Sequence, residues 1–272
     1  MGDDLNRVLE SRAVRGMEAY MYAFKARAHR HHCLGYGTAS LDVDALLKLH
    51  KQYCHAVRPI TFTTLYVKAT ALTLARNPDA NAVLFRKPLG YRIVRFERVD
   101  VNLPITRVLQ GEPVTFIGTI RDAARKTLSE IQDELSEFQH GPPEQSFAIR
   151  RIRQFGRMPL WMAQLIHARM TWSPEFYVRN VGTCGVTFVE GNWFEHFFPI
   201  APTSVVFGIG ALRKEAVVRD NELGIGQRLK CSLMVDNFVI SGLTGASLAR
   251  DFKDILESGS LVSAELDGGI AS

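Results

Sequence analysis

The stretch SLMVDNFVISGLTGASLARDF, residues 232–252, changes its pattern in the middle. Its first residues form an apolar run that predicts a β-strand, and a turn at Ser241-Gly242 leads into helical spacing. The polar pair Asp236-Asn237 ends the strand just before this turn, where a catalytic base would be sought. The stretch therefore predicts a strand–turn–helix unit with polar side chains at its corner.

Around this unit, strands and helices are intermixed along the chain. A charged helix precedes Gly141-Pro142-Pro143, a nearly all-apolar helix ends at Asn77-Pro78, and the chain becomes β after Pro174. A hairpin is expected around DNELGIG, residues 220–226, and a polar tail after the closing helix. In the run 91–109, alternation marks five residues as inward-facing: Ile93, Phe96, Val99, Val101 and Leu103. This order favours an α+β or layered α/β sandwich over a regular dinucleotide-binding repeat.

Composition places the chain among ordinary globular proteins, with 272 residues, 46% hydrophobic and 22% charged. The net charge is +5, but the basic residues are scattered, so nucleic-acid binding is not expected. No apolar run of membrane-spanning length and no secretory leader occurs, which predicts a cytoplasmic protein without a membrane partner. The four cysteines are widely spaced and His31-His32 point to opposite faces of a strand, so no metal site is expected.

Six segments, in this order, resemble the catalytic domain of the dihydrolipoyl acyltransferases of 2-oxoacid dehydrogenase complexes. The resemblance implies a chloramphenicol acetyltransferase-like fold, an α+β two-layer sandwich with a mixed β-sheet and flanking helices. It predicts an N-terminal helical extension over 1–28, an acyltransferase-like domain over 29–258 and a polar tail over 259–272. The segments are 36–52, 60–85, RVDVNLPI at 98–105, RNVGTCGV at 179–186, 201–218 and 232–259.

The resemblance also implies homotrimers with active sites in channels at subunit interfaces. Acyl-CoA enters such a channel from one side and the acceptor from the other, so no cofactor is built in and the acyl donor is a co-substrate. Family members also carry lipoyl and subunit-binding domains, for which this chain is expected to have no room. The expected partners are therefore a small-molecule substrate and two further copies of the chain.

The family's Asp-His-Arg-x-x-Asp-Gly signature falls on residues 236–242, and its chemistry is altered here. Asp236 and Gly242 are kept, but Asn237 takes the place of the base and Ser241 that of the second aspartate. A carboxamide accepts no proton at neutral pH, so Asn237 can only bind and orient a ligand. The family's oxyanion-binding serine falls on Arg179, which would bind an anion or form an ion pair with an acid such as Asp236.

Several side chains are candidates for the missing chemistry. His196 is a candidate base, and it lies in an aromatic segment that either forms a subunit contact or lines a pocket for an apolar ligand. His31 and His32 are candidates on the other side of the channel, and Cys184 is either a nucleophile or a core residue. The aromatic candidates for substrate binding are Trp193, Phe194, Phe197 and Phe198.

Three functions remain open at this point. The first is an acyltransferase that works without the family's histidine, passing an acyl group from CoA or a carrier protein to a small acceptor in a secondary biosynthetic pathway. The second is a scaffold adapted to cyclisation, elimination or isomerisation. The third is a non-catalytic homotrimer.

Overall fold

The computed structural model describes most of the chain from residue 32 onward and scattered residues before it. The described residues are 13, 16, 18–19, 22–23, 26, 32–87, 89–109, 112–142, 158–189, 191, 193–219 and 221–269. Within the helical extension predicted over 1–28, residues 16, 18–19, 22–23 and 26 are helical. His31 lies outside the described residues.

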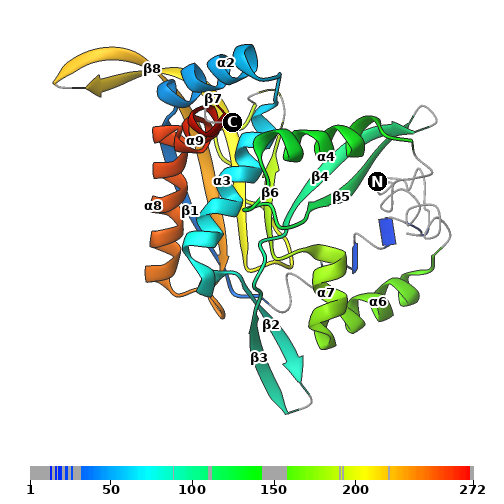
Figure 1. The fold of residues 1–272 in the computed structure, drawn as a ribbon. Helices are drawn as coiled ribbons and strands as arrows, with labels where there is room; N and C mark the ends of the chain where they lie inside the picture. The colour runs from blue at the N-terminus through cyan, green and yellow to red at the C-terminus, as the bar shows by residue number, and fades with distance from the viewer. Residues whose placement is uncertain are drawn as a thin grey trace, which may run out of the picture.

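A mixed six-stranded sheet in the order β1-β8-β7-β6-β4-β5 forms the centre of the molecule (Figure 1). The pairs β1/β8, β7/β8 and β4/β5 are antiparallel, whereas β6 is parallel to both of its neighbours. This confirms the predicted α+β class and the terminal β7–β8 hairpin. The strands are β1 (Leu34–Asp42), β4 (Val101–Leu109), β5 (Glu112–Ile120), β6 (Cys184–Phe188), β7 (Val205–Arg219) and β8 (Glu222–Asp236).

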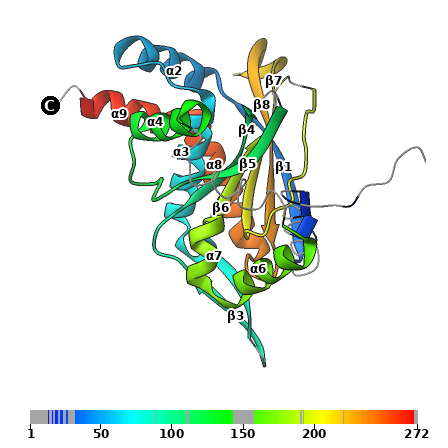
Figure 2. The ribbon, with the colours of Figure 1, turned by 90° about the vertical axis from the view of Figure 1, so that its right-hand side faces the viewer.

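A layer of helices covers one face of this sheet, as Figures 1 and 2 show from two directions. They are α2 (Asp44–Ala56), α3 (Phe62–Arg76), α4 (Leu128–His140), α8 (Gly242–Ser258) and α9 (Ser260–Gly269). At one end of the sheet, a separate hairpin of β2 (Ala82–Lys87) and β3 (Gly90–Arg95) stands beside α6 (Leu160–Trp172) and α7 (Pro174–Val181). The short 3₁₀ helix η1 (Pro78–Ala80) links α3 to this hairpin.

Helix α3 lies in the middle of the helical layer, as its apolar sequence predicts, and it is buried on most sides. It ends at Arg76 because Pro78 disfavours helical geometry for Asn77. The Asn77 side chain donates a 2.7 Å hydrogen bond to Asp251 of α8. Phe207 of β7 stacks on Phe252 of α8 with ring centroids 3.9 Å apart, so α8 is fixed against the sheet.

Two segments differ from the sequence-based expectation in their secondary structure. The run from residue 176 is predicted as β, but α7 occupies 174–181 before β6 begins. The reason is local, because Pro174 stands in the first helical turn and the Ser173 hydroxyl accepts a hydrogen bond from the Phe176 N–H.

The second difference is at the C-terminus, where α9 occupies most of the predicted polar tail 259–272. Gly259 adopts a left-handed conformation with φ +65°, which ends α8 and lets a new helix start in another direction. Leu261 and Val262 are buried in the main core. The packed core therefore continues beyond residue 258.

None of the helices in the described ranges has the length and apolar character that a bilayer crossing requires.

Candidate functional site

A histidine and an aspartate meet at the point where β1 begins and β8 ends. His32 lies just before β1, and antiparallel pairing of Leu34 with Asp236 brings it to the last residue of β8. Nδ1 of His32 is 2.6 Å from Oδ2 of Asp236, and their side chains are 7% and 0% exposed. The two residues are 204 positions apart in sequence.

The Asp236 carboxylate is held by three donors. Oδ1 accepts hydrogen bonds from the backbone N–H groups of Cys33 at 3.0 Å and Phe238 at 3.1 Å. Because the carboxylate accepts at both oxygens, Nδ1 of His32 is the donor in the third bond. This arrangement leaves Nε2 as the ring nitrogen that can take up a proton.

The loop after β8 is fixed by its backbone as well. The N–H of Asn237 donates to the Cys33 carbonyl at 2.7 Å, and the N–H of Asp236 donates to the Ser204 carbonyl at 2.9 Å. The Asp236 carbonyl accepts from the N–H groups of Val239 and Ile240, which closes the turn. Position 237 is thus presented on a rigid corner.

The Asn237 side chain lies over Gly35 of β1. A Cβ atom added at Gly35 would be only 2.6 Å from Nδ2 of Asn237, so glycine leaves the space that the carboxamide occupies. Ser241 has a different role from its neighbours, because its hydroxyl caps α8 by accepting from the Thr244 N–H at 3.2 Å.

Asn237 lines a groove of about 290 Å³ between β1 and α8. Lys253 and Thr38 are among its polar side chains, and the buried rings of Phe207 and Phe252 also line it. Small residues of both elements leave it open: Gly35, Gly37, Ala39, Gly242, Gly245, Ala246 and Ala249. The groove therefore suits a thin, extended and largely apolar chain.

His32 lines a different and much smaller cavity of about 30 Å³, which is enough for roughly one water molecule. Tyr177, His167, Arg86 and Tyr91 also line it. The Tyr177 hydroxyl donates to the Pro202 carbonyl at 3.0 Å. Burial raises the pKa of this hydroxyl, and the nearby Cys184 and Asp236 add to the effect, so Tyr177 is a neutral donor.

The aromatic segment 193–200 crosses strands β7 and β8, away from this corner. Nδ1 of His196 is 3.2 Å from the Cys231 carbonyl. Cys231 precedes Asp236 by five residues of β8, which is about 16 Å along the strand. His196 lines neither the groove nor the cavity. The structure therefore separates the His196 candidate from Asp236 and Asn237.

The aromatic side chains of this segment point outward. Trp193, Phe194 and Phe198 are exposed and Phe197 is half-buried. None of the four lines the groove or the His32 cavity. The Phe198 ring packs edge-on against Tyr36 of β1, with ring centroids 5.2 Å apart. In a single subunit, these rings form an apolar surface.

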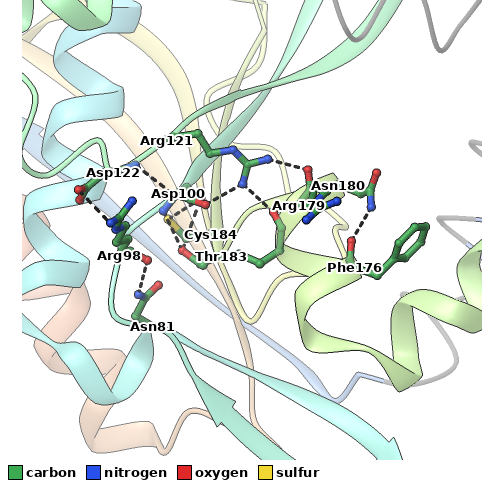
Figure 3. A network of polar contacts seen from close by, with 11 residues as sticks. Asn81, Arg98, Asp100, Arg121, Asp122, Phe176, Arg179, Asn180, Thr183 and Cys184 are labelled. Atoms are coloured by element: carbon green, nitrogen blue, oxygen red, sulfur yellow. Dashed lines mark hydrogen bonds and ion pairs between the residues drawn. The ribbon is translucent and has the colours of Figure 1, made fainter.

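Arg179 is exposed on α7, and Figure 3 shows its surroundings. Its carbonyl accepts from Nη2 of Arg121 at 2.6 Å, while Nη1 of Arg121 is 2.7 Å from Oδ2 of Asp100. No ion pair joins the Arg179 side chain to another described residue, and the Asp236 carboxylate is bound to His32 instead. The network of Figure 3 thus ties α7 to the sheet through Arg121 and Asp100.

Cys184 is fully buried beside Asp100, and burial raises the pKa of its thiol. A buried thiol with a raised pKa is a poor nucleophile, so Cys184 acts as a core residue. Among the described residues, no three side chains of the kinds that bind metals come together.

The contact between His32 and Asp236 is the feature that sequence reasoning missed. The signal available was that Asp236 is kept although the neighbouring base is not, which suggests that the carboxylate still has a partner. Pairing β1 with β8 would then have placed His32 opposite it.

Comparisons with known proteins agree with this architecture. The family described as 2-oxoacid dehydrogenases acyltransferase (catalytic domain) matches residues 10–150 and 170–263. The pyruvate dehydrogenase acetyltransferase component of Rhizobium meliloti is 24% identical over 239 residues, covering 82% of this chain and 44% of the relative. That of Bacillus subtilis is 23% identical, covering 83% and 45%. The chain thus spans less than half the length of the curated relatives it matches.

Solved structures share the fold at low sequence identity. The cubic core of a pyruvate dehydrogenase multienzyme complex has a TM-score of 0.70, 17% identity and 96% coverage of both chains. The Azotobacter vinelandii dihydrolipoamide acetyltransferase, studied for the catalytic roles of a serine, a histidine and an asparagine, has a TM-score of 0.69 with 17% identity and 94% coverage of both chains. Chloramphenicol acetyltransferase has a TM-score of 0.51 with 12% identity, covering 88% of this chain and 94% of the other. The predicted chloramphenicol acetyltransferase-like fold is confirmed.

Proposed function

Because this chain belongs to the family of 2-oxoacid dehydrogenase acyltransferase catalytic domains, we propose that it transfers an acyl group from a thioester to a small-molecule acceptor with His32 as the general base. The observation that carries the proposal is the 2.6 Å hydrogen bond between His32 Nδ1 and Asp236 Oδ2. A buried carboxylate in this position fixes the orientation and the tautomer of the imidazole. The His32–Asp236 pair thus supplies the proton-accepting group that Asn237 lacks.

The reaction follows from these roles. Nε2 of His32 takes the proton of the acceptor's hydroxyl, amine or thiol as that atom attacks the thioester carbonyl. The tetrahedral intermediate then releases a thiolate, which recovers the proton from His32. The Asn237 carboxamide contributes hydrogen bonds to a ligand in the groove, whereas Arg179 and Cys184 have no direct part.

The acyl donor is a co-substrate, either acyl-CoA or an acyl group on a carrier protein. The β1–α8 groove supports this, because its glycine and alanine lining accommodates an extended arm and Lys253 offers a positive charge. The step belongs to a biosynthetic pathway that modifies a small molecule.

The active unit is a homotrimer with sites at subunit interfaces. The exposed rings of Trp193, Phe194 and Phe198 support this, since aromatic side chains are enriched at subunit contacts. The similarity to the cubic core is a second support.

One observation favours a second candidate, in which the trimer binds a ligand without turning it over. The His32 side chain is 7% exposed and its cavity has room for roughly one water molecule. In that case the groove would hold a ligand while the His32–Asp236 pair serves the stability of the corner.

The test is a thiol-release assay with acetyl-CoA, longer acyl-CoA donors and an acetylated carrier protein, against a panel of hydroxyl, amine and thiol acceptors. His32→Gln should lower kcat/KM by roughly 10²- to 10⁴-fold, as loss of a general base does. His196→Gln is the matched control and should leave kcat/KM within about threefold of the value for the unmodified chain. The assignment of the base is wrong if His196→Gln costs as much as His32→Gln, and absence of turnover with every donor favours the second candidate.

A further inference from the structure

Helix α6 belongs to a part of the chain that the family pattern does not account for. The family match ends at residue 150 and resumes at residue 170, so most of α6 (Leu160–Trp172) lies between the two matched ranges. In Figures 1 and 2 this helix lies at the end of the molecule opposite α2. What α6 does must therefore follow from its own residues.

One face of α6 holds the helix against the body of the molecule. Ala163, His167 and Met170 are buried, at the i, i+4 and i+7 spacing of a single helix face. Met170 is part of the core cluster that joins α6 to the β2–β3 hairpin and α7. His167 and Met170 also line the His32 cavity. The orientation of α6 is thus fixed, with one face toward the candidate site.

The opposite face of α6 is apolar and exposed. Trp161 is 60% exposed, Leu165 is 61% exposed and Trp172 is 48% exposed. With 3.6 residues per turn, these three side chains fall within about 40° of one another around the helix axis. Met162, which is also exposed, lies at the edge of the same face. A helix that is apolar on all sides is normally buried, so this exposed face indicates a partner surface.

The sequence around α6 carries only positive charge. Between Glu144 and Glu175 the chain has five arginines and neither an acidic residue nor a lysine. Arg169 is exposed on α6, with its guanidinium 5.2 Å from the centre of the Phe176 ring. The other four arginines, at positions 150, 151, 153 and 157, precede the helix and lie outside the described residues. The last of them is four residues from the start of the exposed face, at most about 14 Å along the chain, so an anionic surface would be attracted to α6.

The neighbouring β2–β3 hairpin adds exposed apolar side chains at the same end of the molecule (Figures 1 and 2). Leu89 at its turn is fully exposed, and Tyr91 and Ile93 of β3 are exposed as well. Ile93, which the sequence alternation predicts as inward-facing, is exposed because β3 belongs to this hairpin and not to the main sheet. In the sequence, Leu89 stands between Lys87 and Arg92. This end of the molecule thus combines apolar and basic residues on two elements.

We infer that the exposed face of α6 binds the surface of an anionic phospholipid bilayer. Tryptophan and leucine side chains on one face, with arginines that attract anionic lipids, are typical of helices that lie in a membrane interface. A two-fold contact between copies of the chain would bring the same positive segment against itself, whereas an anionic bilayer carries the opposite charge.

The inference is independent of the proposed acyl transfer. The sequence predicts no membrane partner because it has no apolar run of spanning length, but a helix on a membrane surface needs only one apolar face. Because the buried face of α6 lines the His32 cavity, the bilayer would lie about one helix diameter, or roughly 10 Å, from that cavity.

The test is co-sedimentation with vesicles of phosphatidylglycerol and phosphatidylcholine in equal parts, and with vesicles of phosphatidylcholine alone. The unmodified chain should partition onto the anionic vesicles at least about tenfold more strongly than onto the neutral ones, and salt should reduce this difference. Leu165→Glu should lower the partition coefficient for the anionic vesicles by about tenfold or more, and Trp161→Gln, which adds no charge, should lower it as well. Both side chains are exposed, so the fold should tolerate the two changes.

Leu223→Glu is the matched control, because it makes the same substitution at an exposed leucine of the β7–β8 hairpin, which projects at the opposite end of the molecule from α6 (Figures 1 and 2). It should leave the partition coefficient within about twofold of the unmodified value. An unmodified chain that does not bind the anionic vesicles, or equal losses for Leu165→Glu and Leu223→Glu, overturns the inference. Sedimentation velocity without lipid tests the other occupant: if Leu165→Glu lowers the oligomeric state, the face is a subunit contact and the membrane assignment is wrong.

Discussion

Removing the imidazole of His32 should destabilise the folded chain, because it leaves the Asp236 carboxylate buried with one donor fewer. The Asp236 side chain is 0% exposed, so in the folded chain its carboxylate depends on protein donors for its hydrogen bonds. A hydrogen bond to a charged group contributes about 1.5–3 kcal/mol, and breaking a buried ion pair costs about 3–5 kcal/mol. The backbone donors of Cys33 and Phe238 remain, so we expect His32→Ala to cost about 2–3 kcal/mol.

The measurement is urea-induced unfolding at fixed protein concentration, because assembly would otherwise change the apparent stability. His32→Gln retains an N–H donor and should recover part of the loss. A double-mutant cycle of His32→Ala with Asp236→Ala isolates the pair, and the two effects should couple by about 1–3 kcal/mol. A cost below about 0.5 kcal/mol for His32→Ala, or strictly additive effects in the cycle, would refute the buried pair.

Three further predictions concern other parts of the fold. Ser241→Ala should lower the free energy of unfolding by about 1 kcal/mol through loss of the α8 cap, whereas Ser241→Asp should not; equal losses in urea unfolding would contradict the capping role. Burial raises the pKa of the Glu265 carboxyl, so its stabilising contribution is present below the usual Glu pKa of about 4.3 and is lost as the pH rises through the folded value. Glu265→Gln should therefore show a smaller decrease in Tm between about pH 4 and 7 than the unmodified chain, and an identical decrease would count against this assignment. Burial raises the pKa of the Cys231 thiol to about 12 and also raises that of Cys184, so a thiol reagent at about pH 8 should label the exposed Cys33 first, as mass spectrometry of the digest would report.

Local patterns in the sequence were sufficient for the parts of the fold that local physics decides. The strand–turn–helix at 232–252 is present as predicted, with Ser241 as the cap of α8. Helix α3 and the β7–β8 hairpin also follow from apolar spacing and turn residues. The resemblance then supplied the two-layer architecture, a mixed sheet with flanking helices, which no local pattern contains.

The errors arose where a short apolar run fits two structures. Alternation over 91–109 is compatible with one long strand, but β3 ends at Arg95 and β4 starts at Val101 in a different sheet. The segment after Pro174 carries β-type residues, yet the Ser173 cap decides for a helix. In both cases tertiary pairing or capping overrides propensity.

The candidate site could not be derived in the same way, because its central contact joins residues 204 positions apart. The sequence marks position 237 as altered and offers three histidines as substitutes, His196 in the aromatic segment and His31 and His32 before the first strand. His196 lies about 16 Å along β8 from the corner, whereas His32 reaches it through strand pairing.

The two sides of this corner now have different chemistry. Asn237 points into the large groove and can bind but not take a proton, whereas His32 is held by Asp236 on the small cavity next to the β2–β3 hairpin. If the base acts from that side, the reacting atom must approach past Arg86 and Tyr91, and the groove serves to position the other substrate. Acyl transfer should therefore depend on the imidazole of His32, whereas selection of the substrate in the groove should depend on Asn237 and the residues beside it.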